Sequence, residues 1–290
     1  MTPTGGRDML SAMGEFGLAF GRRRRDETAF RWGERRGAAG LLDRVRGWLA
    51  PAGLPTVFHV THHKAGSQWI NRIFHALAYE RLVLPKRDDS QFLEAPVQAG
   101  KIYPTLYVTR EQFESVRVPE NSRRFVVIRD LRDTLVSAYF SIKHSHAMEA
   151  EGDLRMRERL HACGFEDGLL YLIDTWLPDR AAVQQSWLGG PDDILKYEDM
   201  LRRDEEILAR VLLDHCRLGV TREKFREVVL ANRFESRAGR KPGAEDVNSH
   251  ERKGVAGDWQ NHFTAKVADA FKARFGALLI DTGYERDAGW

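Results

Sequence analysis

The stretch from Val57 to Leu77 constrains the fold more than any other part of the sequence. Residues 57–61, Val-Phe-His-Val-Thr, are predicted to form a short strand, and a polar loop that contains glycine follows at 62–66. Apolar side chains then recur at helical spacing, at Trp69, Ile70, Ile73, Phe74 and Leu77. A strand, a tight loop and a helix in this order open a β-α-β unit, which predicts a parallel sheet.

Strands and helices continue to alternate along the chain. An extended segment is predicted at 101–108, where Pro104 confines it to a sheet edge or a bulge, and the apolar run at 125–128 is typical of a parallel strand. A capping box at Thr109-Arg110-Glu111-Gln112 begins a short helix, and Thr264 caps the last helix. Between them the sequence predicts helices at 131–140, 166–187 and 198–216, a strand at 193–197, a helix that ends over 228–234 and a long loop at 241–257. This order predicts an α/β fold, a single three-layer domain with a mostly parallel central sheet, over residues 51–290.

The charge distribution separates the first fifty residues from this domain. Residues 1–50 hold ten arginines, four of them in the run 22–25, and six acidic residues, so their net charge is +4. We expect a basic, poorly ordered N-terminal extension, although an arginine cluster also suits acidic lipid or RNA. The whole chain carries a net charge of +3, so the rest is close to neutral, which argues against a general nucleic-acid binder.

Cysteine content and hydropathy narrow the class further. Two cysteines, Cys163 and Cys216, are too few for a disulfide framework, so we expect a cytoplasmic protein. No apolar run approaches the roughly 20 residues that a membrane span needs. No metal site is predicted, because His144-x-His146 is too short a cluster to hold an ion. The sequence does not indicate an oligomeric state.

The loop after the first strand has the composition of an anion site. The small residues in His62-His63-Lys64-Ala65-Gly66-Ser67-Gln68-Trp69 let the backbone approach a ligand, and the amides at the start of the next helix favour a phosphate. Lys64 adds a positive charge and Ser67 a hydroxyl donor. The lysine precedes the glycine, unlike the order in a Walker A loop. An ordinary β-α turn with a surface lysine is the alternative.

A second basic residue stands where the strand at 125–128 ends. Ligands of open α/β sheets bind at the carboxyl ends of strands, where Arg129 can hold a phosphate with two donors. Ser137 lies about two helical turns inside the next helix and can face the same anion. In the alternative, Arg129 pairs with Asp133 across the turn. Two basic sites on adjacent strand ends suggest a ligand with two separate phosphates, such as a nucleoside bisphosphate.

Five segments resemble, in the same order, the motifs of the sulfotransferase family. Lys64–Trp69 is similar to the P-loop-like 5′-phosphosulfate loop Lys-Ser-Gly-Thr-Thr-Trp, and Arg129 with Ser137 resembles the 3′-phosphate site. Residues 195–199, Leu-Lys-Tyr-Glu-Asp, resemble a Tyr-Glu-Asp strand end, and residues 232–235, Asn-Arg-Phe-Glu, resemble a Ser-Phe segment. Residues 252–259, Arg-Lys-Gly-Val-Ala-Gly-Asp-Trp, are similar to the family's Arg-Lys-Gly-x-x-Gly-Asp-Trp loop, the most specific of the five.

The resemblance implies in-line transfer of a sulfuryl group, without a metal, from 3′-phosphoadenosine 5′-phosphosulfate (PAPS) to a hydroxyl or amine, with the bisphosphate PAP as product. It assigns the 5′-phosphosulfate to Lys64, Ala65, Gly66, Ser67 and Gln68, the 3′-phosphate to Arg129, Ser137, Arg252, Lys253 and Gly254, and the adenosine to Trp69, Tyr197 and Phe234. The alternative for Trp69 and Tyr197 is plain core packing.

The general base is the one point at which the chain departs from the family. The usual histidine belongs to a Lys-Thr-His strand end, and the comparable residues 102–109 contain no histidine. Lys64 is expected to stabilise the leaving oxygen, and its neighbour His63 is the candidate base. Tyr107 is a poorer base, because its ordinary pKa lies near 10. A purely structural role for His62 or His63 is the alternative.

Two other functions remain open at this stage. The missing histidine is compatible with a non-catalytic protein that binds PAPS or PAP. A P-loop-like kinase would need the Walker A order, which the loop lacks. For the sulfotransferase we expect a small-molecule or glycan acceptor.

Overall fold

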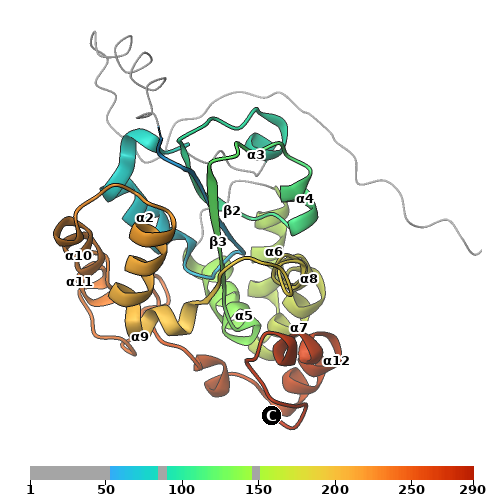
Figure 1. Cartoon of the computed structure of the whole chain (residues 1–290). Helices are drawn as coiled ribbons and strands as arrows, with labels where there is room; N and C mark the ends of the chain where they lie inside the picture. Colours follow the sequence, from blue (N-terminus) through green and yellow to red (C-terminus); the bar gives the residue numbers. More distant parts are fainter. Residues whose placement is uncertain (1–52, 84–89, 146–150) are drawn as a thin grey trace, which may run out of the picture. The chain divides into compact units, whose positions relative to one another are not determined.

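The computed structural model describes residues 53–83, 90–145 and 151–290, which all lie in one compact unit of the chain, Asp43–Trp290. The predicted basic extension, 1–50, lies outside the described residues. The central sheet has four parallel strands in the order β2-β1-β3-β4 (Figure 1). Their bounds are β1 Thr56–Thr61, β2 Ile102–Leu106, β3 Ser122–Ile128 and β4 Ile194–Lys196.

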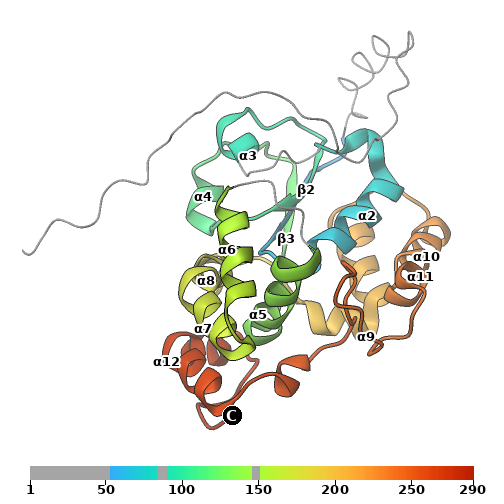
Figure 2. The same cartoon turned by 180° about the vertical axis from the view of Figure 1, so that it is seen from behind.

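Helices cover both faces of this sheet, so the fold has the three predicted layers. One face carries α2 (Ser67–Ala78), α9 (Tyr197–Leu208) and α10 (Arg222–Ala231), and the strands pack on the other face against α8 (Leu177–Ser186) (Figures 1 and 2). α5 (Leu131–Phe140) and α7 (Phe165–Thr175) pack beside α8 in a further apolar cluster. The remaining helical segments are η1 Tyr79–Arg81, α3 Ser90–Glu94, α4 Arg110–Glu114, η2 Ser141–Ser145, α6 Glu151–Ala162, η3 Ala209–His215, α11 Phe234–Ala238, η4 Asp258–Asn261 and α12 Ala265–Asp281.

Alternation along the strands builds a separate core on each face. Val57 and Val127 point to the α2 side and pack in the same cluster as Ile70. Phe58 and Val60, which alternate with Val57 along β1, point to the other side, where Trp187 lies fully buried. Complete burial of one such apolar side chain contributes about 1.5–3 kcal/mol, so the period-two pattern fixes which face each helix covers.

The structure confirms the predicted fold class and most of the element order. Pro104 lies in β2, the edge strand, and Thr109 and Gln112 form the predicted capping box. Thr264 caps α12 by accepting the Val267 amide. No helix or strand forms between 241 and 257.

Two predicted helices are wrong in their extent. The helix predicted at 166–187 is two helices, α7 and α8, which meet at Trp176. Pro178 is the reason, because it has no N–H to continue the first helix and suits the first turn of a new one. The helix predicted to end over 228–234 stops at Ala231, and Phe234 begins α11. None of the helices over the described ranges is long and apolar enough to cross a bilayer.

Candidate active site

The loop between β1 and α2 places a positive charge and a helix N-terminus side by side. Lys64 (φ 68°) and Gly66 (φ 87°) both have left-handed backbone, and Gly66 is the N-cap of α2. A Cβ on Gly66 would lie 2.8 Å from the ring of Tyr197. The position therefore requires glycine both for its conformation and for space, and the first amides of α2 are left facing a ligand.

Lys64 lies in a cluster of like charges. The pKa of its amine is lowered to about 8, first by burial and then by the positive charges of Arg129 and Arg252, with Glu251 acting in the opposite direction. Arg129 also donates from Nη1 to the Lys64 carbonyl at 2.9 Å. Fixed cations that lower one another's pKa favour an anion between them.

Arg129 extends from the carboxyl end of β3 into the same place. Its guanidinium stacks over the ring of Tyr197 at 4.7 Å, and its Nε is buried without a hydrogen-bond partner among the described residues. The alternative pairing with Asp133 is marginal, since Nη2 lies 4.0 Å from that carboxylate. The Asp133 carboxylate instead accepts hydrogen bonds from two backbone N–H groups of the loop at 252–259.

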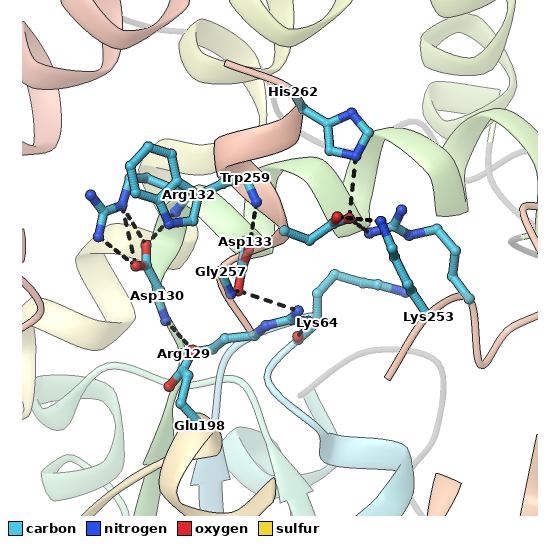
Figure 3. Close-up of polar contacts among 12 residues, drawn as sticks. Lys64, Arg129, Asp130, Arg132, Asp133, Glu198, Lys253, Gly257, Trp259 and His262 are labelled. Carbon is cyan, nitrogen blue, oxygen red and sulfur yellow. Dashed lines mark hydrogen bonds and ion pairs between the residues drawn. The ribbon is translucent and has the colours of Figure 1, made fainter. Parts of the chain in front are cut away.

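Asp133 and Asp258 fasten the loop at 252–259 over this cluster (Figure 3). The buried Asp133 carboxylate accepts the backbone N–H of Gly257 at 2.7 Å and that of Trp259 at 2.9 Å. Asp258 accepts from Lys253 and Arg252, each at 2.5 Å. Burial alone would raise the pKa of Asp258, but the hydrogen bonds from Lys253, Arg252 and Asn261 hold it well below its usual range.

These segments enclose a cavity of about 190 Å³. Of the described residues it is lined by His63, Lys64, Gly66, Ser67, Gln68, Trp69, Arg72, Tyr107, Arg129, Ser137, Tyr197, Phe234, His250, Glu251, Arg252, Lys253, Gly254 and Val255. An adjoining cavity of about 380 Å³ shares Trp69, Tyr197 and Phe234 with it. The three aromatic side chains therefore stand between the two cavities and line both of them.

The residues present fit a nucleotide with two phosphates. Gly254 (φ 65°) faces the ring of Phe234, and a Cβ there would lie 2.5 Å from that ring, so any side chain would clash with the ring. Trp69 meets Tyr197 edge to face at 6.3 Å, and its indole N–H is buried without a partner among the described residues. Buried donors of this kind are costly unless a ligand accepts from them.

All but one of the residues predicted to touch the nucleotide line the first cavity. The exception is Ala65, which is fully buried inside the loop. Sequence reasoning missed Arg72, His250 and Glu251. Arg72 lies one helical turn after Trp69 and so faces the same side of α2, a signal that helical spacing carries. Arg72 pairs with Glu251 at 3.1 Å, and no local pattern predicts that contact.

His62 and His63 differ sharply although they are adjacent. His62 is buried, its Nδ1 donates to the His63 carbonyl at 3.0 Å, and its Nε2 therefore accepts the Arg129 amide at 3.3 Å. Burial is the main cause that lowers the pKa of His62 to about 4. His62 is therefore neutral, and its two hydrogen bonds join the ends of β1 and β3. This is the purely structural role that was the alternative for His62.

His63 instead lines the cavity and stacks on Tyr107, with ring centroids 3.8 Å apart. The Tyr107 hydroxyl lies 2.9 Å from Ser67 Oγ in the first turn of α2. His63 also meets the ring of Trp176 edge to face at 6.4 Å. The imidazole thus contacts two aromatic rings and lines the same cavity as Lys64.

An α/β domain in which a lysine-bearing loop, a second basic strand end and three aromatic side chains line one cavity fits a nucleotide with two phosphates. A family model described as the sulfotransferase domain matches residues 54–283. The 3-alpha-hydroxysteroid sulfotransferase of Cavia porcellus is 24% identical over 240 residues, which cover 73% of this chain and 79% of that protein. The structure of mouse sulfotransferase SULT7A1 complexed with PAP superposes with a TM-score of 0.56 at 18% identity, covering 81% of this chain and 89% of that one.

The chain belongs to the sulfotransferase domain family. This confirms the predicted enzyme class, a sulfotransferase that uses PAPS, and favours it over a kinase or a non-catalytic nucleotide-binding protein. Among the described residues, no three His, Cys, Asp or Glu side chains gather as a metal site would require.

Proposed function

We propose that the cavity binds PAPS with the sulfuryl group beside Lys64 and His63, and that the acceptor is a small molecule with a hydroxyl group. The observation that carries this proposal is the convergence of Lys64, Arg129 and Arg252, from three distant segments, on one cavity. The Cavia porcellus relative is named for a hydroxysteroid, which supports a small hydroxyl acceptor over a glycan.

Each wall of the site receives one part of the nucleotide. Lys64 and the residues from Gly66 to Gln68 hold the 5′-phosphosulfate. Arg129 and Ser137 hold the 3′-phosphate, and the loop residues Arg252–Gly254 close over it. Trp69, Tyr197 and Phe234, which line both cavities, surround the adenosine.

PAPS supplies a sulfuryl group whose bond to the 5′-phosphate breaks as a new bond to the acceptor oxygen forms. Lys64 and the first amides of α2 stabilise the negative charge that develops on the leaving oxygen. His63 takes the proton of the acceptor hydroxyl, and the stacked Tyr107 orients its ring. Because the fixed cations already meet the leaving group, the site performs this chemistry with its own side chains.

The first test compares nucleotides. PAP should raise the melting temperature strongly, by the equivalent of about 2.7 kcal/mol at a hundred times its dissociation constant, whereas ATP with magnesium should do much less. Labelled PAPS is then offered with a panel of small hydroxyl compounds, and transfer to at least one is expected. Equal stabilisation by PAP and ATP would contradict the nucleotide assignment. PAP binding without transfer to any compound would point to a non-catalytic binder.

We also propose a cytoplasmic location. Cys163 and Cys216 are both free thiols, which is the state that a reducing compartment maintains. Fractionation of the cells that express the protein tests this, and recovery from an oxidising compartment would contradict it.

A further inference from the structure

The break between α7 and α8 brings an aromatic ring and a cation to the edge of the active site. Trp176 ends α7 and is buried, and its ring meets His63 edge to face at 6.4 Å. Arg180, one turn into α8, stacks its guanidinium over that ring at 4.3 Å. The chain of contacts therefore runs from the candidate base through Trp176 to Arg180.

Arg180 is poorly neutralised by the protein. Its side chain is 17% exposed, and Nη1 donates to the Trp176 carbonyl at 2.9 Å and to Asp179 at 3.3 Å. The Asp179 side chain is 85% exposed, and surface pairs of this kind contribute little. Burial lowers the pKa of the guanidinium, and Asp179 and the more distant Asp153 oppose this effect only in part.

One edge of the guanidinium is left without an acceptor. Its Nε is buried and has no partner among the described residues, and Nη2 donates no hydrogen bond there either. Nε and Nη2 form the fork that binds a carboxylate or phosphate with two parallel hydrogen bonds. A buried donor without an acceptor is destabilising, so an anion at this edge would be favoured.

The cation lies near the reacting groups but outside the nucleotide cavity. Its charge lowers the pKa of His62, and the Tyr107 hydroxyl acts in turn on Arg180. Arg180 and Trp176 do not line the cavity that holds Lys64, Arg129 and Arg252. The nucleotide phosphates therefore have their own cations, and Arg180 is available to the other substrate.

We propose that Arg180 binds an anionic group of the acceptor, a carboxylate or a phosphate, while Trp176 packs against the acceptor's carbon skeleton. This inference rests on the proposed function and specifies its substrate class, a hydroxyl compound that already carries a negative charge. Arg180 is then a specificity-determining residue, and it takes no part in the proton transfer.

Matched acceptors test the proposal. Phenols and alcohols that differ only in a carboxylate, a phosphate or a neutral amide are offered with PAPS, and the two anionic arms distinguish carboxylate from phosphate recognition. The anionic members should have the higher kcat/KM. In Arg180→Gln their kcat/KM should fall about 10- to 100-fold, the loss expected for a hydrogen-bonded charge pair, with the KM for PAPS unchanged. Arg180→Lys keeps the charge but lacks the two parallel donors. Its kcat/KM for the anionic acceptors should lie between those of the unaltered protein and Arg180→Gln.

Arg274→Gln is the matched control, because Arg274 also lies over an aromatic ring, Phe275, and pairs with a surface carboxylate, Asp174, on another part of the domain. Neutral acceptors that are used equally well, or an equal loss for both classes in Arg180→Gln, would overturn the proposal. If no compound is sulfated, the proposed function fails on its own. The anion site is then decided by titrating the same compounds into PAP-loaded protein, where binding that does not depend on the anionic group overturns it.

Discussion

The carboxylate of Asp133 accepts the backbone N–H of Trp259 at 2.9 Å, although 126 positions separate the two residues. With the second hydrogen bond from Gly257, this contact joins α5 to the loop at 252–259 (Figure 3). The same loop carries Arg252 and Lys253, so one buried carboxylate positions the loop that we propose closes over the nucleotide.

Asp133→Asn should therefore weaken nucleotide binding without removing any group that touches it. Asparagine keeps one acceptor oxygen and loses the other, so one buried backbone N–H is left unpaired at a cost of about 1–3 kcal/mol. We expect the dissociation constant of PAP to rise about tenfold by calorimetry, with a lower midpoint of urea unfolding. Asp174→Asn, a substitution on the surface, is the control. Unchanged PAP affinity in Asp133→Asn would show that the loop is positioned by other contacts.

The affinity for PAP should depend on pH through Lys64. Its pKa of about 8 in the free protein lies below the ordinary lysine value, and a bound anion raises it again, so the nucleotide binds the protonated amine more tightly. Affinity is then fully present below pH 8 and falls at higher pH, by about tenfold per pH unit until the pKa of the complex is reached. Calorimetry between pH 7 and pH 9.5 measures this decline.

Lys64→Met separates this effect from other titrations. The variant should bind PAP more weakly at pH 7, and its affinity should hardly change up to pH 9.5. A decline as steep as that of the unaltered protein would assign the titration to another group.

Arg129→Ala should discriminate between two nucleotides. If Arg129 holds the 3′-phosphate, the loss of a charge-assisted pair worth roughly 1.5–3 kcal/mol should weaken PAP far more than adenosine 5′-phosphosulfate, which lacks that group. Competition binding with both ligands gives the ratio. A similar loss for both would mean that Arg129 acts through its hydrogen bond to the Lys64 carbonyl and supports the loop.

The two adjacent histidines should separate catalysis from stability. His63→Ala is expected to lower the turnover rate by roughly 10²–10⁴, the range for a general base, with PAP affinity nearly unchanged. His62→Ala removes two buried hydrogen bonds and should mainly lower the free energy of unfolding, with a much smaller effect on turnover. Rate measurements at saturating PAPS, alongside urea unfolding, distinguish the two.

Near-full turnover in His63→Ala would place the base elsewhere, and Tyr107→Phe becomes the decisive variant. Tyr107 is the natural second candidate because its hydroxyl lies 2.9 Å from the Ser67 hydroxyl at the start of α2. A large loss in Tyr107→Phe alone would assign the proton transfer to the phenol.

Much of the fold, and most of the residues that line the candidate cavity, could be predicted from short stretches of sequence. The strand, loop and helix from Val57 to Leu77, the basic strand end at Arg129 and the loop at 252–259 each carry their chemistry within a few consecutive residues. Backbone preferences and side-chain periodicity also act over a few consecutive residues, so these features can be predicted without the tertiary structure.

The tertiary structure alone decided how these pieces meet. The pairing of Asp133 with Trp259 and the stacking of His63 on Tyr107 join residues far apart in the chain, and no local pattern encodes such contacts. The break at Trp176 shows the same limit, because Pro178 indicates where a helix stops, whereas only packing determines that Trp176 meets His63 and that Arg180 stacks on Trp176. Local propensity determines which segments form helices and strands. Burial of their apolar faces against one another determines which of these helices and strands become neighbours.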